Sequence, residues 1–318
     1  MKIIVTGASG FIGSWICRVL SINHDVTALV QLDSNTFKLK GINSIKVVSI
    51  NSDAWKDFIL RNKPEVLVLA DWWGVENTFR DDEEQFENVH RILKLGEAAK
   101  EVKVNTVIGI GSQAEIGSVE YTIDEDSPDN PSTKYGIAKV QTRQKMNTLF
   151  TNSETRFVWM RIFSSYGPLD TGNWLIPKLV DTLTAGERMS LTSGDQEWNY
   201  LHVYDLAKAF EMVIESKNIN GIVNVGNIET IKIKSAILEI AYQLESKHLL
   251  DFGALDYRDD QVMKLIPNCE KLVKSGWEPV IEFESGITQT ILWLQRKNSE
   301  TLSSKYGEKI SLNLPARP

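Results

Sequence analysis

The amino-acid sequence predicts an α/β protein with a doubly wound parallel sheet and a smaller, interleaved C-terminal lobe. Short β-branched runs alternate with amphipathic stretches through the first half of the chain, which is the pattern of strands joined by crossover helices. A glycine-rich turn follows the first run directly, and clusters of turn residues divide the second half into shorter elements. Together these observations favour one sheet domain that carries a lobe built from insertions.

The expected strands of the first half are short and rich in β-branched residues: Lys2–Val5, Asp25–Val30, Ile45–Ser49, Val66–Ala70 and Asn105–Ile110. The expected helices between them have apolar residues at helical spacing: Gly13–Ile22, Trp55–Arg61, Asp82–Lys100 and Tyr135–Phe150. Because helices join consecutive strands, the sheet is expected to be parallel, with helices on both faces.

The second half is expected to return to this sheet. Apolar runs at Arg156–Phe163 and Gly221–Val225 suit further strands, whereas the turn-rich segments around them suit a separate lobe. We therefore assign residues 1–162 to the sheet domain and 163–297 mainly to the lobe. Residues 298–318 mix polar and charged side chains with little periodicity, and this composition predicts a partly ordered tail.

Charge and cysteine content limit the possible partners. The net charge of −7 and the pI near 5.3 oppose a general attraction to nucleic acids or anionic lipids. Cys17 and Cys269 lack metal-ligand spacing, so we expect neither a disulfide framework nor a metal site. The N-terminal segment has no long apolar run, and no later segment is apolar enough to span a bilayer. We expect a cytoplasmic protein.

The first motif that carries chemistry is TGASGFIG at residues 6–13, between the first strand and the first helix. Gly7 permits a tight turn, Gly10 lets the backbone approach a pyrophosphate, and Gly13 lets the helix pack closely on the strand. The phosphates would then lie at the positive N-terminus of the helix. This combination predicts a dinucleotide-binding site.

The second motif is YGIAK at residues 135–139. Its spacing places the phenol of Tyr135 and the ammonium of Lys139 one turn apart on the same helical face. The ammonium can lower the pKa of a tyrosine and bind cofactor hydroxyls, while the tyrosine exchanges a proton with a substrate oxygen. Ser112, after an apolar strand, could hydrogen-bond the same oxygen.

With these motifs, the sequence resembles the extended short-chain dehydrogenase/reductase family of nucleotide-sugar epimerases, dehydratases and ketoreductases over about 295 residues, through TGASGFIG, LVLA, ENVHRILKLGEAAK, GSQAEIG and YGIAK. In the second half RIFSSYGP, LTSGDQEWNYLHVYDLAKAF, GIVNVG and YRDDQVMKLIPNCEKLVKSGWEP follow the same order. The resemblance implies a Rossmann domain, a catalytic set of Ser112, Tyr135 and Lys139, and a role in polysaccharide biosynthesis.

The resemblance also implies binding residues. The implied cofactor contacts are Gly7, Ser9, Gly10, Phe11, Ile12, Gly13, Gln31, Ala70, Asn88, Tyr135 and Lys139. The implied substrate contacts are Trp72, Ser112, Ser164, Trp198 and Arg258, with Arg258 placed on the substrate diphosphate. Two of these depart from the family pattern, because Ser164 stands where relatives often have asparagine and Trp198 where they often have arginine. Trp72 and Trp73 suit either a sugar pocket or the core.

The cofactor preference depends on the end of the second strand. NAD-preferring relatives commonly have an aspartate there for the ribose hydroxyls, and the aligned residue is Val30. Gln31 follows, with Lys38 and Lys40 as candidate phosphate partners, and Asp33 as an alternative ribose ligand if the loop folds back. We favour NADP(H) over NAD(H).

We expect a 4-ketoreductase that acts on a nucleotide-linked 6-deoxy or dideoxy sugar. Hydride from the nicotinamide would reach the sugar ketone, Tyr135 would protonate the alkoxide, Ser112 would polarise the carbonyl, and Lys139 would hold the ribose. A 4-epimerase with tightly bound NAD uses the same residues and stays open, as does a non-catalytic NAD(P) sensor. The resemblance further implies a homodimer through the helices Asp82–Lys100 and Tyr135–Phe150.

Overall fold

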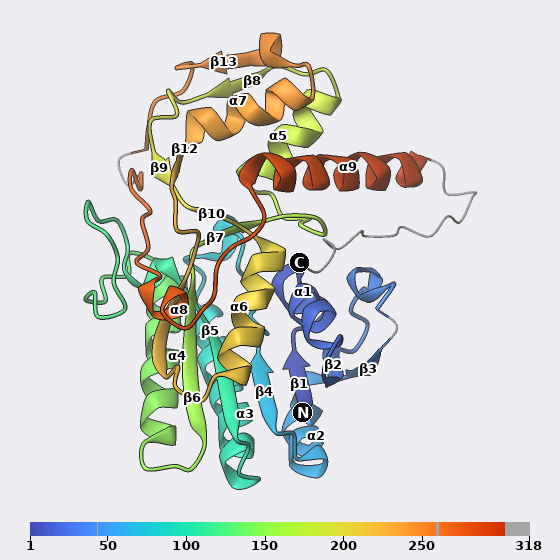
Figure 1. Cartoon of the computed structure of the whole chain (residues 1–318), viewed down its shortest axis with the longest axis vertical. Coiled ribbons are helices and arrows are strands. Elements are labelled where there is room, and N and C mark those ends of the chain that lie inside the picture. The colour runs from blue at the N-terminus through green and yellow to red at the C-terminus, as the bar shows by residue number, and fades with distance from the viewer. Residues whose placement is uncertain (43, 259–260, 303–318) are drawn as a thin grey trace.

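The structure is a computed structural model that describes residues 1–42, 44–258 and 261–302 (Figure 1). Within these residues, seven parallel strands form one sheet in the order β11-β6-β5-β4-β1-β2-β3. The strands are β1 (Lys2–Thr6), β2 (Asp25–Gln31), β3 (Ile45–Ile50), β4 (Val66–Leu69), β5 (Thr106–Ser112), β6 (Arg156–Ile162) and β11 (Gly221–Val225). The order reverses direction between β1 and β4.

Helices cover both faces of this sheet. One face carries α1 (Phe11–Leu20) and α6 (Val203–Glu215), and the other carries α2 (Trp55–Asn62), α3 (Gln85–Glu101) and α4 (Lys134–Phe150). Because side chains alternate along a strand, Ile3 and Val5 of β1 pack in the first layer, whereas Ile4 packs in the second. The predicted doubly wound parallel fold is confirmed.

The smaller lobe lies beyond the carboxyl ends of the strands, where Figure 1 shows α5 and α7 above the sheet. Its strands form pairs, β7 with β10, β9 with β12, and β8 with β13. Its elements are β7 (Ser164–Tyr166), α5 (Leu175–Thr184), β8 (Met189–Leu191), β9 (Glu197–Trp198), β10 (Tyr200–His202), β12 (Ile231–Lys232), α7 (Ile233–Gln243), β13 (Leu250–Phe252) and α9 (Phe283–Leu302). The short helix α8 (Glu270–Val273) instead packs against β11 of the main sheet.

The two lobes interleave as expected. Strands β6 and β11 join the main sheet at the two late apolar runs that the sequence marked as strands. Helix α6 belongs to the sheet layer too, because it packs against α1, although it lies within the segment assigned mainly to the lobe. The division at residue 162 stays an interpretation of the sequence.

Some predicted boundaries are wrong by a few residues. Helix α1 begins at Phe11 instead of Gly13, because Gly10 is already its N-terminal cap. Helix α3 begins at Gln85 instead of Asp82, because the preceding residues form successive turns in which Asp82 accepts a hydrogen bond from the Gln85 amide.

Helix α9 continues through Leu302. The helix therefore includes residues 298–302, which the sequence had assigned to the tail, and residues 303–318 lie outside the described residues. In the described part of the chain no helix, α9 included, combines the length and the hydrophobicity that a membrane crossing requires.

Candidate active site

The glycine-rich turn holds α1 tightly against the sheet. Gly7 has φ +61°, and a Cβ atom there would lie 2.6 Å from the Ala70 carbonyl oxygen at the end of β4. A Cβ atom on Gly13 would lie 2.5 Å from the Gly7 carbonyl oxygen. Both positions therefore require glycine, because any side chain there would push α1 away from β1 and β4.

The N-terminus of α1 is available to a ligand. Gly10 caps the helix without a side-chain hydrogen bond, so the first amide groups of α1 have no capping side chain. They lie where the strand order reverses between β1 and β4, the place at which open α/β sheets bind ligands. This end of the site fits the diphosphate of a dinucleotide, since the amides and the helix dipole both favour negative charge.

A cavity of about 760 Å³ runs from this helix to the smaller lobe. It is lined by twelve of the residues that the sequence predicted for the site: Gly10, Phe11, Ile12, Gly13, Ala70, Trp72, Ser112, Tyr135, Lys139, Ser164, Trp198 and Arg258. Gly7, Ser9, Gln31 and Asn88 do not line it. The volume and the mixture of apolar walls with a few polar groups are typical of small-molecule sites.

Tyr135 lies near the start of α4, and its side chain is buried against the cavity wall. Burial raises the pKa of the Tyr135 phenol, while a hydrogen bond with Ser112 and the positive charge of Arg80 oppose this rise. The Arg80 guanidinium carbon lies 5.1 Å from the centre of the Tyr135 ring. The phenol therefore stays protonated at neutral pH and has a hydroxyl partner at hand, as a proton donor to substrate requires.

Lys139 is held between β5 and Trp72. Its Nζ donates a 2.8 Å hydrogen bond to the Ile110 carbonyl and lies 3.5 Å from the centre of the Trp72 ring. Burial lowers the pKa of Lys139 to about 7, although the charges of Glu115 and Asp71 oppose this shift. Trp72 thus lines the cavity, which is one of the two positions the sequence left open, and its ring also supports the lysine.

Ser112 is fixed from behind by a fully buried carboxylate. Its amide donates a 2.8 Å hydrogen bond to Oε1 of Glu115, which also accepts one of 2.9 Å from Trp159 Nε1. The other oxygen of Glu115 lies 3.1 Å from Nε of Arg143 and 3.7 Å from Nε of Arg161. Since its hydrogen bonds and ion pairs satisfy the buried charge, Glu115 orients Ser112 and does not line the cavity.

The two departures from the family pattern contact each other. Trp198 Nε1 donates a 2.7 Å hydrogen bond to Ser164 Oγ, and both side chains line the cavity. An asparagine and an arginine would place amide and guanidinium groups at these positions, whereas this pair presents an indole and a hydroxyl whose polar atoms bond to each other. The substrate end of this site therefore carries less positive charge than the family pattern implies.

Asn88 and Gln31 lie away from the cavity. The Asn88 amide bonds both backbone groups of Trp73, at 2.9 Å and 3.0 Å, and so holds the segment after β4 in place. Gln31 is exposed at the end of β2. Trp73 is 37% exposed and packs on Phe79, so it is not a core aromatic.

Near the loop after β2, Lys38 and Asp170 line the same cavity. Both are buried, and burial raises the pKa of Asp170 to about 6 while the Gly172 amide and Lys38 oppose the shift. Lys40 is exposed, and Asp33, with φ +67°, occupies an exposed turn outside the cavity lining. Of the two lysines suggested as phosphate partners, Lys38 lines the cavity and Lys40 does not.

Sequence reasoning missed several lining side chains. Arg80 lies between Tyr135 and Trp174, with its guanidinium carbon 5.9 Å from the centre of the Trp174 ring, and its Nε is buried without a hydrogen-bond partner. Gln113, Gln196 and Gln261 also line the cavity. Arg80 stands beside a run of acidic residues that is typical of a solvated surface, so no local signal distinguished it.

Comparison with known proteins agrees with this geometry. The model of the NAD dependent epimerase/dehydratase family matches residues 3–226. The dTDP-D-glucose 4,6-dehydratase of Mus musculus is 25% identical over 338 aligned positions, which cover 100% of this chain and 94% of the mouse protein. Among solved structures, the UDP-N-acetylglucosamine 4-epimerase of Methanobrevibacter ruminantium, in complex with UDP-N-acetylmuramic acid, has a TM-score of 0.85 at 23% identity and covers 93% of this chain and 98% of its own.

A further solved structure is similar in fold. The dTDP-glucose 4,6-dehydratase of Streptomyces venezuelae, solved with NAD bound, has a TM-score of 0.84 at 18% identity, covering 94% of this chain and 98% of that protein. At these identities the structural likeness establishes the fold, while the family match extends over both the glycine-rich turn and the tyrosine-lysine helix.

Proposed function

Because this chain is an enzyme of the NAD dependent epimerase/dehydratase family, we propose that it reduces the 4-keto group of a nucleotide-linked 6-deoxy or dideoxy sugar. The observation that carries the proposal is the arrangement of Ser112, Tyr135 and Lys139 in one cavity with the N-terminus of α1. The glycine contacts at the turn fit a dinucleotide diphosphate, and a bound reduced nicotinamide supplies the hydride.

The proposed chemistry assigns a distinct role to each side chain. Ser112 polarises the sugar carbonyl by donating a hydrogen bond to its oxygen. As hydride adds to the carbonyl carbon, the Tyr135 hydroxyl gives its proton to that oxygen and an alcohol forms. Lys139, when charged, stabilises the resulting phenolate, and Arg80 adds a second positive charge beside the same ring. The product is the sugar alcohol, with its new C–H bond made by the hydride that a bound reduced nicotinamide would supply.

A 4-epimerase is the alternative that uses the same residues. It would return the hydride to the opposite face of the sugar and would need no added reductant. Epimerization requires the keto intermediate to rotate in the site between the two transfers, so tight contacts at both ends of the sugar oppose it. Because Trp198 and Ser164 hydrogen-bond each other, their polar groups are less free to change partners as a sugar rotates in the site. This favours reduction over epimerization.

Dehydration, the activity in the name of the mouse relative, makes greater demands on the site. Loss of water from a sugar needs a base for a carbon-bound proton and an acid for the departing hydroxyl. The acid nearest to Ser112 in sequence is Glu115, whose carboxylate is turned away into Trp159 and Arg143. Gln113 and Ala114, which precede it, carry no acidic group. Residues 113–115 therefore present no acid to the cavity beside Ser112, and this favours keto reduction over dehydration.

The proposal extends to ligands and assembly. We expect NADP(H) in preference to NAD(H), because β2 ends without a carboxylate that contacts the cavity and Lys38 lies within reach of a phosphate. NAD bound to the Streptomyces venezuelae protein lends this preference no support, so titrations with NADH and NADPH must decide it. We also propose a cytoplasmic role in polysaccharide biosynthesis.

A homodimer through α3 and α4 remains part of the proposal. The two helices pack side by side on one face of the sheet (Figure 1). Ile137 of α4 is an exposed apolar residue that a second copy could cover. Light scattering at assay concentration tests it, with a mass of twice 35.9 kDa expected. A single-chain mass would refute the dimer and leave the proposed reaction standing.

The test of catalysis is Tyr135→Phe. Removing the hydroxyl should lower turnover of a nucleotide 4-keto sugar at least about a hundredfold, the usual contribution of a positioned acid, while NADPH affinity stays unchanged. Steady-state assays and a fluorescence titration measure the two quantities. Near-normal turnover would remove Tyr135 from the reaction. Tyr121→Phe, which removes the same hydroxyl from an exposed tyrosine outside the cavity lining, is the matched control.

A further inference from the structure

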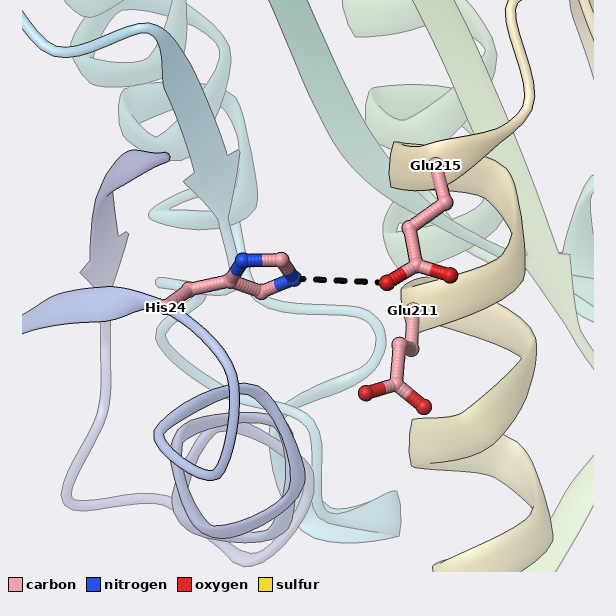
Figure 2. Close-up of side chains that lie close together, drawn as sticks. All are labelled: His24, Glu211 and Glu215. Atoms are coloured by element: carbon pink, nitrogen blue, oxygen red, sulfur yellow. Dashed lines mark ion pairs between the residues drawn. The ribbon is translucent and has the colours of Figure 1, made fainter.

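A second polar cluster lies at the opposite end of the sheet from the cavity. His24 precedes β2, and Glu211 and Glu215 occupy the last turns of α6 (Figure 2). Glutamates four residues apart share a helical face, so both carboxylates are presented to the turn that carries His24. Nothing in the proposed reaction uses these three residues, because the active site is built at the carboxyl ends of the strands.

The spacing of the three groups suits a metal ion. One ligand atom from each residue lies within 4.8 Å of the other two, and His24 Nε2 is 3.7 Å from a carboxylate oxygen of Glu215. Two ligand atoms on a tetrahedral zinc ion, each about 2.1 Å from the metal, are about 3.4 Å apart. Small side-chain movements would therefore bring the present positions to coordination distances.

The imidazole supplies an independent observation. The His24 side chain is only 8% exposed, and its Nε2 is buried without a hydrogen-bond partner. Figure 2 shows this nitrogen directed at the glutamates. A buried imidazole nitrogen without a hydrogen bond is costly, and coordination to a metal would satisfy it.

The C-terminal end of α6 also favours a bound cation. Glu211 and Glu215 lie near the C-terminus of α6, where the helix dipole is negative, and the last turn contains no basic residue. The Glu211 carboxylate already accepts hydrogen bonds from Lys208 and, at 3.3 Å, from Asn23. Lys208 therefore supplies part of the positive charge and competes with a metal.

We propose that His24, Glu211 and Glu215 form a site for a divalent transition-metal ion such as zinc. One nitrogen and two carboxylate ligands suit zinc, whereas magnesium prefers oxygen ligands alone. Beside the cluster, a cavity of about 540 Å³ lined by His24 and Glu215 gives a path for the ion and room for a water as fourth ligand. The bound ion would tie the start of β2 to the end of α6.

This site departs from our expectation of no metal, which rested on the two cysteines. His24 and the two glutamates come from segments far apart in the chain, so their spacing carries no metal signature in the sequence. His24 lies in the turn that follows α1, and the packing of α6 against α1 brings the two glutamates to it.

Calorimetric titration of the untagged, chelator-treated full chain with zinc chloride tests the proposal. We expect one zinc ion per chain, a higher thermal midpoint with zinc, and no comparable effect of magnesium chloride. His24→Gln and Glu215→Gln should each weaken zinc binding at least about tenfold. Glu215 has a half-exposed side chain, 53% accessible, so its variant should fold even if the His24 variant does not.

Two further variants separate this site from adventitious binding. His90 lies 3.8 Å from Glu87 on α3 in an exposed pair, so His90→Gln should leave zinc binding unchanged. Lys208→Ala removes the competing ammonium and should tighten binding. Absence of saturable zinc binding, or equal loss in the His24 and His90 variants, would overturn the proposal. Neither result bears on keto reduction, which is assayed separately and without added zinc.

Discussion

The two ends of the active-site cavity are built in different ways. The end at α1 consists of backbone, with a helix N-terminus that no side chain caps. Its glycines are packed so closely that an added Cβ atom would lie 2.5 Å or 2.6 Å from a neighbouring carbonyl oxygen. The end at the smaller lobe consists of side chains, including Ser164, Trp198 and Arg258, which come from separate segments. The backbone end can recognise a diphosphate shared by many ligands, whereas the side-chain end must distinguish one sugar from another.

This difference implies different responses to mutation. A substitution at the backbone end should move the helix and affect every ligand that uses it. A substitution at the side-chain end should weaken binding of the sugar nucleotide and leave cofactor binding unchanged, because we expect the two diphosphates at different ends of the cavity. The following variants test that contrast, beginning with the largest expected effect.

Gly13→Ala should weaken dinucleotide binding by about 3 kcal/mol, the upper end of the usual cost of overpacking. The added methyl group would lie 2.5 Å from the Gly7 carbonyl oxygen, and overpacking of this kind displaces backbone. A fluorescence titration with NADPH measures the loss, and circular dichroism checks that the variant is folded. Unchanged NADPH affinity in a folded variant would mean that the diphosphate does not depend on this helix position.

Arg258→Ala should weaken binding of the nucleotide diphosphate by about 2 to 3 kcal/mol, because the charge-assisted hydrogen bonds that we expect Arg258 to make with the phosphates would be lost. NADPH affinity should hardly change. Arg258→Lys should restore part of the loss, since a point charge cannot reproduce a two-pronged contact. Calorimetry with each ligand separately provides the measurement, and equal weakening of both would show that Arg258 is misplaced.

Asp170→Asn should stabilise the protein at neutral pH by roughly 2 to 3 kcal/mol. Burial raises the pKa of Asp170 from 3.8 to about 6, so the folded state binds more protons than the unfolded state between these values. Stability of the wild type therefore falls as pH rises from about 4 to about 6. The advantage of the variant should be largest above pH 6 and small near pH 4, as urea denaturation at both pH values would reveal. A constant difference would contradict the shift.

The hydrogen bond between Ser164 and Trp198 should be worth about 1 kcal/mol. A double-mutant cycle with Ser164→Ala and Trp198→Phe measures it through the free energy of unfolding. We expect a coupling energy near that value and a smaller coupling in substrate binding. Additive effects of the two substitutions would show that the pair does not act as a unit.

The sequence was most informative where structure is local. TGASGFIG and YGIAK each lie within a few residues of one strand or helix, so their geometry follows from spacing, and the structure brings Gly10, Tyr135 and Lys139 to one cavity. The bond of Trp198 to Ser164 and the position of Arg80 over Tyr135 join segments distant in sequence. Such contacts depend on how the lobes fold together, and no pattern of period or spacing encodes them.

The most direct test of the central claim is the fate of reduced cofactor with a nucleotide-linked 4-keto-6-deoxy sugar. We predict that the wild-type protein oxidises one NADPH for each sugar alcohol formed and that Tyr135→Phe does so at least about a hundredfold more slowly. Absorbance of the reduced cofactor and mass spectrometry of the sugar follow the two products together. Interconversion of 4-epimeric nucleotide sugars with no added reductant, and no consumption of NADPH or NADH with the keto sugar, would contradict the account.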